Sequence, residues 1–177
     1  MVAGDIRLTV CEYETAKKLF REAVRQDKTV HIHIGLDTGM SRIGFADTPE
    51  SVEEIKKIAA LDHLEIEGMF THFARADETD KTPAADQLNR YLAFAELLEK
   101  SGVHIPLKHC SNSAGIIRMK EANLDAVRAG ITIYGIYPSN EVERDIVKLE
   151  PAMELKSHIS YVKDLEPGAS ISYGGTY

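Results

Sequence analysis

The sequence alternates between short apolar runs and segments in which apolar residues recur every three or four positions. The first pattern is typical of strands, and the second is typical of helices that bury one face. Two helices should begin at a threonine followed by proline, because threonine caps a helix and proline fits its first turn (Thr48-Pro49 and Thr82-Pro83). Alternation of strands with helices predicts a parallel sheet joined by helical crossovers. We expect strands at residues 6–10, 29–37, 66–73, 106–111 and 125–135, and helices near 16–24, 48–59, 82–98 and from 113 onward.

Polar residues gather where these strands are expected to end, at residues 37–42, 71–72, 111–113 and 128–131. A barrel and an open doubly wound sheet both fit the alternation. An open sheet, however, collects its functional residues at one switch point. A (β/α)8 barrel builds its site from several successive loops at the carboxyl ends of its strands. The sequence therefore predicts an α/β fold, a partial (β/α)8 TIM barrel.

The pattern changes after about residue 146. Residues 152–165 form a longer strand-like run, and residues 166–177 read as a turn followed by the start of another strand. We expect residues 1–146 to be the C-terminal part of a barrel and residues 147–177 to begin a β domain. The expected strand–helix units are too few to close an eight-stranded barrel, so we expect a chain that is incomplete at both ends.

Composition excludes some classes of partner. The net charge of −7 and the isoelectric point near 5.5 give no basic surface, so we expect no nucleic-acid partner. No apolar run approaches the roughly 18 residues of a membrane span, and the N-terminus lacks a signal-peptide pattern. Cys11 and Cys110 are far apart and suit a reducing compartment. These features predict a cytoplasmic protein with no membrane partner.

The strand expected at residues 29–37 carries an H-x-H pair. His31 and His33 lie on one face of it, as metal ligands do in some barrel hydrolases. With His72, His109 and an aspartate they would complete a plausible zinc set. Several strand residues follow His33, however, which places the pair deep in the barrel rather than at its catalytic rim. We therefore expect polar packing and no metal, while a metal-dependent TIM-barrel hydrolase stays open as an alternative.

Candidate chemistry lies in four loops. Arg42 stands between two glycines and offers a planar fork suited to a carboxylate or phenolate, although a surface salt bridge would explain it too. His72 ends an apolar strand, where a hydrogen-bonded core histidine is the common alternative. "CSNSAG" (110–115) and "VRAGI" (127–131) are small loops on the same expected face, and both are suited to holding a phosphate. Each signal is weak alone, but two neighbouring phosphate-capable loops reinforce each other.

Five motifs, in order along the chain, resemble the alanine racemase family, fold-type III enzymes that use pyridoxal 5'-phosphate (PLP). They are "DTGMSRIGF" (37–45), "THFARADE" (71–78), "HCSNSAG" (109–115), "AVRAGITIYGIYP" (126–138) and "ISYGGTY" (171–177). The resemblance implies barrel strands four to eight and the start of the C-terminal β domain. It also implies part of an isomerase that interconverts L- and D-alanine, supplies D-alanine for peptidoglycan, and is a homodimer at full length.

The resemblance implies roles for single residues. Arg42, with Met40 beside it, matches the arginine that reaches the substrate carboxylate and the region of the cofactor's phenolate. Arg128 matches the arginine that faces the pyridine nitrogen, and His72 matches the histidine that hydrogen-bonds it. Tyr173 matches the catalytic tyrosine, which acts across the homodimer interface. The implied catalytic set is Tyr173, His72 and Arg128.

The cofactor's phosphate and the proton transfers complete this picture. By resemblance, Asn112 and Ser113 fall in the phosphate-holding loop, and Gly130 and Ile131 supply backbone donors. Racemisation removes a proton from one face of Cα and returns one to the other, so it needs two bases, a lysine and Tyr173. An arginine at the pyridine nitrogen stays protonated and should leave that nitrogen unprotonated, which limits side reactions.

The chain departs from the family pattern at two places. The PLP-binding lysine of a "VKANAYG"-like motif is absent from residues 1–177, and Lys108 is not expected to replace it. Gly35 stands where many members carry a carbamylated lysine that holds the arginine, so Arg42 must be positioned in another way. We expect the isolated chain to be inactive. Two further alternatives stay open. One is a serine racemase domain of the glycopeptide-resistance type, and the other is a fragment that is active only within a longer chain.

Overall fold

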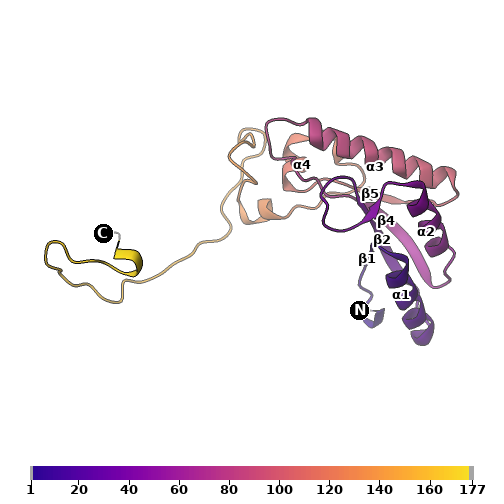
Figure 1. The fold of residues 1–177 in the computed structure, drawn as a ribbon, viewed down its shortest axis with the longest axis horizontal. Helices are drawn as coiled ribbons and strands as arrows, with labels where there is room; N and C mark the ends of the chain where they lie inside the picture. Colours follow the sequence, from indigo (N-terminus) through magenta and orange to yellow (C-terminus); the bar gives the residue numbers. More distant parts are fainter. Residues whose placement is uncertain (1, 176–177) are drawn as a thin grey trace.

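The computed structural model describes residues 2–175, and its centre is a parallel sheet (Figure 1). The strands are β1 (Leu8–Val10), β2 (Val30–Asp37), β3 (Phe45–Ala46), β4 (Leu64–Phe70) and β5 (Leu107–His109). Their order is β1-β2-β4-β5, and the short β3, which the sequence did not predict, pairs with the end of β2. Every pairing is parallel, as the alternation predicted, so the carboxyl ends lie along one edge of the sheet.

Helices join the strands. They are α1 (Tyr13–Gln26), α2 (Pro49–Ala59), α3 (Thr82–Lys100) and α4 (Ser113–Arg118), with 3₁₀ turns η1 (Val2–Gly4), η2 (Lys120–Ala122), η3 (Ile131–Tyr134) and η4 (Tyr173–Gly175). Both helices begin at the Thr-Pro pairs, as expected, with Thr48 as the N-cap residue of α2. Thr82 is instead the first residue of α3, after Lys81, and neither helix has a side-chain capping hydrogen bond. Within residues 2–175, no helix is both long and apolar enough for a membrane crossing.

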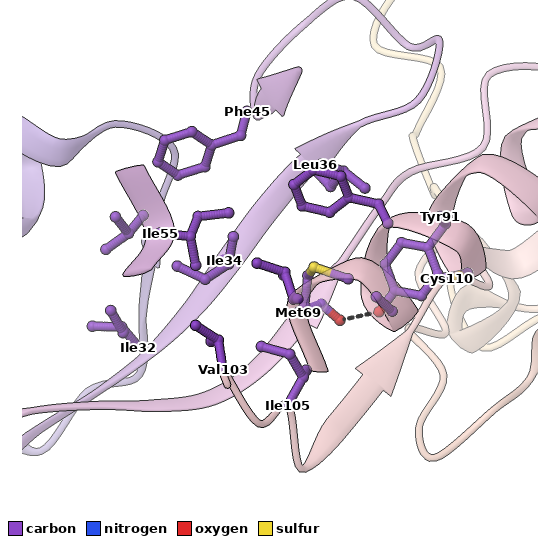
Figure 2. Close-up of a cluster of buried hydrophobic side chains, with 14 of the residues drawn as sticks. Ile32, Ile34, Leu36, Phe45, Ile55, Met69, Tyr91, Val103, Ile105 and Cys110 are labelled. Atoms are coloured by element: carbon purple, nitrogen blue, oxygen red, sulfur yellow. Dashed lines mark hydrogen bonds between the residues drawn. The ribbon is translucent and has the colours of Figure 1, made fainter. Parts of the chain in front are cut away.

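One face of the sheet packs against the helices. Ile32, Ile34 and Leu36 of β2 are buried in this core (Figure 2). Tyr91 of α3 is also buried, and its hydroxyl donates a hydrogen bond to the carbonyl oxygen of Met69 on β4 at 2.6 Å. Because side chains alternate along a strand, the intervening residues of β2 face the other side of the sheet. That side would be the interior of a barrel.

The strand expected at residues 125–135 is not formed, and that prediction was wrong. The backbone N–H groups of Asp125 and Arg128 donate to the carbonyl oxygens of Lys108 and Ser111, at 3.1 and 3.0 Å. The chain then turns into η3 instead of continuing beside β5. The N–H of Gly130 donates to the hydroxyl of Ser113, so a side chain takes the hydrogen bond that a neighbouring strand would otherwise accept.

The described structure also has no strand at residues 152–165. This segment extends away from the sheet (Figure 1), and Leu155, Ile159 and Val162 are exposed along it. A strand forms only where a neighbour takes up its backbone hydrogen bonds. The N–H of Ala152 donates to the carbonyl oxygen of Tyr134 at 3.1 Å, but beyond Ala152 no described residue forms a backbone pairing with this segment. The domain boundary near residue 146 stays a prediction.

Candidate active site

The loops after β4 and β5 and the segment before η3 surround one cavity of 330 Å³. Its volume lies in the range of small-molecule sites, which is about 300–1,000 Å³. Every residue expected at the cofactor lines it. These are His72, Asn112, Ser113, Arg128, Gly130 and Ile131, joined by Asp77, Ala114 and Pro138.

Arg128 is held by the ends of two strands. Its Nη2 donates to the carbonyl oxygens of Thr71 (2.7 Å) and Cys110 (3.1 Å). Its Nη1 donates to the carbonyl oxygen of His109 (3.0 Å) and to the Nδ1 atom of the same residue (2.7 Å). The guanidinium also lies over the ring of Phe70, 5.3 Å from its centre. Burial lowers the pKa of Arg128, but an arginine stays charged at neutral pH.

His72 lies between Arg128 and Asn112. Its Nδ1 is 3.5 Å from Nη2 of Arg128, and its Nε2 is 3.5 Å from Nδ2 of Asn112. Burial lowers the pKa of His72, and the charges of Arg128 and Arg42 add to this effect. The ring is therefore neutral at pH 7 and can accept a hydrogen bond from Arg128.

Ser113 links the two small loops that the sequence suggested for a phosphate. Its Oγ accepts hydrogen bonds from the backbone N–H groups of Gly130 (3.0 Å) and Thr132 (3.3 Å). Asn112 caps α4, because its Oδ1 accepts from the N–H of Gly115 at 3.0 Å. Two N–H groups that converge on one oxygen resemble the backbone concavities in which proteins hold anions.

The turn that carries Arg42 is shaped by an aspartate and a glycine. Oδ1 of Asp37 accepts from the N–H groups of Gly39 (2.9 Å) and Ser41 (3.0 Å). Gly44 has a φ of +126°, and a Cβ there would lie 2.5 Å from the backbone nitrogen of Asp37. Only glycine fits this position, so any side chain at residue 44 would force the turn to shift.

Three of the expected site residues lie outside the cavity. Arg42 is exposed, although its charge is close enough to affect His72. Met40 is half-buried in the same turn. Tyr173 is fully exposed in η4, at the yellow end of the chain and far from the sheet (Figure 1). The action of Tyr173 in a partner's site stays a prediction.

Gly35 packs closely against Cys11. A Cβ at Gly35 would lie 2.9 Å from Sγ of Cys11 and 3.4 Å from the ring of Phe70. A lysine at this position would therefore require Cys11 to move. In place of such a lysine, Arg90 of α3 holds the turn after β2, because it donates to the carbonyl oxygen of Thr38 at 2.9 Å.

Gln87 is a second α3 residue that sequence reasoning missed. Its buried amide donates to the carbonyl oxygen of His72 (3.1 Å) and the hydroxyl of Thr38 (3.3 Å). Its Oε1 accepts from the N–H of Ala74 at 2.9 Å, so it joins the loops after β2 and β4. Its position was the available signal, because it lies four residues before Tyr91 on the apolar stripe of the helix.

The H-x-H pair makes protein contacts. His33 lies 2.8 Å from His109 and 3.1 Å from Glu67. Among residues 2–175, no group of three His, Cys, Asp or Glu side chains is placed to hold a metal ion. Lys108 donates to the carbonyl oxygen of Ile105 at 2.7 Å and does not line the cavity.

The motifs and the cavity agree with the comparisons to known proteins. Residues 1–138 match the family described as alanine racemase, N-terminal domain. The chain belongs to the alanine racemase family. An alanine racemase from Methanococcus maripaludis is 47% identical over 177 residues, which are 100% of this chain and 48% of that protein. One from Clostridium perfringens is 44% identical over 100% of this chain and 46% of its own length.

Solved alanine racemase structures share the fold. That of Clostridium difficile 630 has a TM-score of 0.90 and 43% identity, covering 99% of this chain and 46% of its own. That of Bacillus anthracis, with bound L-Ala-P, has a TM-score of 0.88 and 34% identity, covering 99% of this chain and 46% of its own. This chain thus spans about half the length of the relatives it matches. The sheet and its helices are part of an alanine racemase α/β barrel, so the predicted fold class is confirmed.

Proposed function

We propose that this chain is the part of a PLP-dependent alanine racemase that holds the ring and the phosphate of the cofactor. The supporting observation is the 330 Å³ cavity, which is lined by all six residues expected at PLP. The charged Arg128 and the neutral His72 lie on its wall. Beside them, the backbone N–H groups of Gly130 and Thr132 donate to Oγ of Ser113, and a bound phosphate would compete with that oxygen for these donors. This donor set fits a planar group with an anionic tail.

When bound, PLP supplies an electron sink that makes the Cα–H bond of an amino acid acidic. Arg128 would donate a hydrogen bond to the pyridine nitrogen and, because it stays protonated, would leave that nitrogen unprotonated. His72 accepts from Arg128 and helps to orient it. Arg42 binds the substrate carboxylate, with Met40 packed beside it. Tyr173 of the partner subunit in a homodimer moves the proton on one face of Cα.

The second base and the biological role belong to the full-length protein. We infer that its lysine serves the other face of Cα, so residues 1–177 alone do not racemise alanine. The product, D-alanine, would supply peptidoglycan synthesis in the cytoplasm. The substrate is alanine, because the matching proteins of Methanococcus maripaludis and Clostridium perfringens are alanine racemases.

The test uses purified full-length protein loaded with PLP. L-alanine, D-alanine and L-serine are each supplied, and the enantiomers are separated by chiral chromatography. We expect racemisation of both alanine enantiomers, with serine turned over much more slowly. A preference for serine would favour the serine racemase alternative. Stoichiometric zinc, with no PLP and no racemisation, would overturn the proposal.

A further inference from the structure

Arg128 ends a chain of four contacts that crosses the sheet face opposite the apolar core. Nη1 of Arg128 lies 2.7 Å from Nδ1 of His109, and Nε2 of His109 lies 2.8 Å from Nδ1 of His33. Nε2 of His33 lies 3.1 Å from Oε2 of Glu67, which accepts from Nε of Arg7 at 3.2 Å. We call these five residues the histidine chain.

The donor capacity of arginine fixes the hydrogens along the histidine chain. Arginine has no acceptor, so Nδ1 of His109 must accept from Arg128, and a neutral His109 carries its hydrogen on Nε2. That hydrogen points at Nδ1 of His33, which must therefore accept as well. His33 then carries its own hydrogen on Nε2 and donates it to Glu67. All the bonds between Arg128 and Glu67 run in one direction, and protonation of either ring would set two donors against each other.

We propose that Glu67 and His33 are positioning residues for Arg128 that act through His109. Glu67 accepts the last bond and thereby selects one tautomer of both imidazoles, which keeps the unprotonated Nδ1 of His109 facing Arg128. The step from a positioned Arg128 to catalysis rests on the proposed function. The hydrogen-bond direction itself does not.

The surroundings hold the histidine chain in this arrangement. His33 pairs with Gly68 and Ile32 pairs with Ile66, so Glu67 is the extra residue of a β-bulge, a device that re-aims side chains. A Cβ at Gly68 would lie 2.8 Å from Cε1 of His33, so the glycine leaves room for that ring.

Charge and burial favour the same direction. The hydrogen bond from Arg7 holds the pKa of Glu67 below its usual range, so Glu67 is an anion at neutral pH. Burial, with the charge of Arg128, lowers the pKa of His109 to about 4, so this ring is neutral. Within residues 2–175, the hydrogen bonds of Arg128 go to carbonyl oxygens and imidazole nitrogens rather than to a carboxylate. Glu67, reached through two rings, is the anion at the end of its network.

His31, the other histidine of the H-x-H motif, and its neighbour Glu65 provide a matched control. Nδ1 of His31 lies 3.4 Å from Oε2 of Glu65. His31 comes two residues before His33 on β2, and Glu65 comes two residues before Glu67 on β4. Glu65 is more exposed than Glu67, with side-chain exposures of 60% and 29%. Glu65→Gln therefore makes the same chemical change beside a histidine that has no part in the histidine chain.

The test is made on full-length protein with ¹⁵N-labelled histidine. Long-range ¹H–¹⁵N spectra near neutral pH report the tautomer of each ring, and His33→Gln and His109→Gln assign the signals. We expect both rings of the unsubstituted protein to be neutral Nε2–H tautomers. Glu67→Gln, whose amide can donate or accept, should give mixed tautomers at both rings, and Glu65→Gln should change neither.

Activity gives the second readout. Glu67→Gln should lower kcat for alanine by about tenfold, a usual scale for residues that orient a site through another group, with little change in KM. Glu65→Gln should leave both constants unchanged. An Nδ1–H tautomer at His109 in the unsubstituted protein, or equal effects of the two variants, would overturn the proposal. If the unsubstituted protein does not racemise alanine, the proposed function fails, while the spectra still decide the direction of the histidine chain.

Discussion

The hydroxyl of Ser113 accepts a hydrogen bond from the backbone N–H of Gly130 at 3.0 Å, which joins the loop after β5 to the segment before η3. The N–H of Thr132 donates to the same oxygen at 3.3 Å. Ser113 is buried, whereas Gly130 is exposed and Thr132 is half-buried, so loss of the hydroxyl would remove two hydrogen bonds worth about 0.5–1.5 kcal/mol each. Both loops of the expected phosphate site depend on this one atom.

Ser113→Ala in the full-length protein should weaken PLP binding by about tenfold or more, because about 1.4 kcal/mol corresponds to a factor of ten. Titration of cofactor-free protein with PLP, followed by absorbance, measures the dissociation constant. Ser101→Ala is the control, because its hydroxyl donates to the carbonyl oxygen of Leu98 at the end of α3 and does not line the cavity. An unchanged dissociation constant in Ser113→Ala would contradict the phosphate assignment.

Gln87→Leu should destabilise the protein and loosen the loop of His72. The leucine keeps most of the volume but removes the bonds to Thr38, His72 and Ala74, at a cost of about 1–3 kcal/mol in the free energy of unfolding. Urea unfolding measures this loss. Gln26→Leu, at the end of α1, is the control and should change stability much less. Equal losses in the two variants would show that the bridge between the loops adds little.

The sequence predicted the fold where local patterns dominate. The Thr-Pro pairs placed two helix starts, and apolar runs placed β1, β2, β4 and β5, because these signals depend on neighbouring residues. The strand expected at 125–135 failed because the chain there bonds to Ser113, a contact that no local pattern reveals. The resemblance to a family predicted that the cavity residues act together at one site. From the residue types alone, a structural role remained open for each of them.

Other parts of the site depend on contacts between distant residues. Gln87 and Arg90 hold the loops from α3. The place of Gln87 on the apolar stripe of the helix signals that it is buried, but no local pattern reveals its partners in the distant loops. The sequence predicted polar packing for His33 deep in the barrel. It could not predict the partners His109 and Glu67, because they lie on two other strands and meet His33 only through the register of the sheet. Gly35 was recognised as a departure, but its close packing against Cys11 and Phe70 appears only in the structure.

Stability should fall in mild acid because of His109. Its pKa is about 4 in the folded state, mainly through burial, against about 6.5 when unfolded. Between these values the unfolded chain binds more protons, so the free energy of unfolding decreases as pH falls from about 6.5 to about 4. Urea unfolding of the full-length protein at several pH values measures the slope. His109→Gln should flatten it, while the exposed His104→Gln should not, and equal slopes in all three proteins would contradict the prediction.

Tyr173→Phe in the full-length protein tests the proposed second base. Phenylalanine keeps the ring but removes the ionisable oxygen, so racemisation should fall by about 10²–10⁴-fold in both directions. PLP should stay bound, because the substitution leaves its lysine and its phosphate contacts untouched. Solvent deuterium should still enter Cα of the enantiomer that the lysine deprotonates. Tyr161→Phe, another exposed tyrosine of the C-terminal segment, is the control and should behave like the unsubstituted protein.

The location of Tyr173 in the partner's site makes a stricter prediction about mixed dimers. A Tyr173→Phe subunit has an intact cavity but lacks the tyrosine it would give to its partner, and an Arg128→Ala subunit has a damaged cavity but keeps its tyrosine. In a mixed dimer, the intact cavity therefore receives the intact Tyr173, and one of the two sites is complete. Co-refolded mixtures should racemise alanine at a rate well above that of either variant alone, and differently tagged subunits allow the mixed dimer to be isolated and assayed. If Tyr173 instead served the cavity of its own subunit, each site of the mixed dimer would carry one of the two lesions, and activity would not recover.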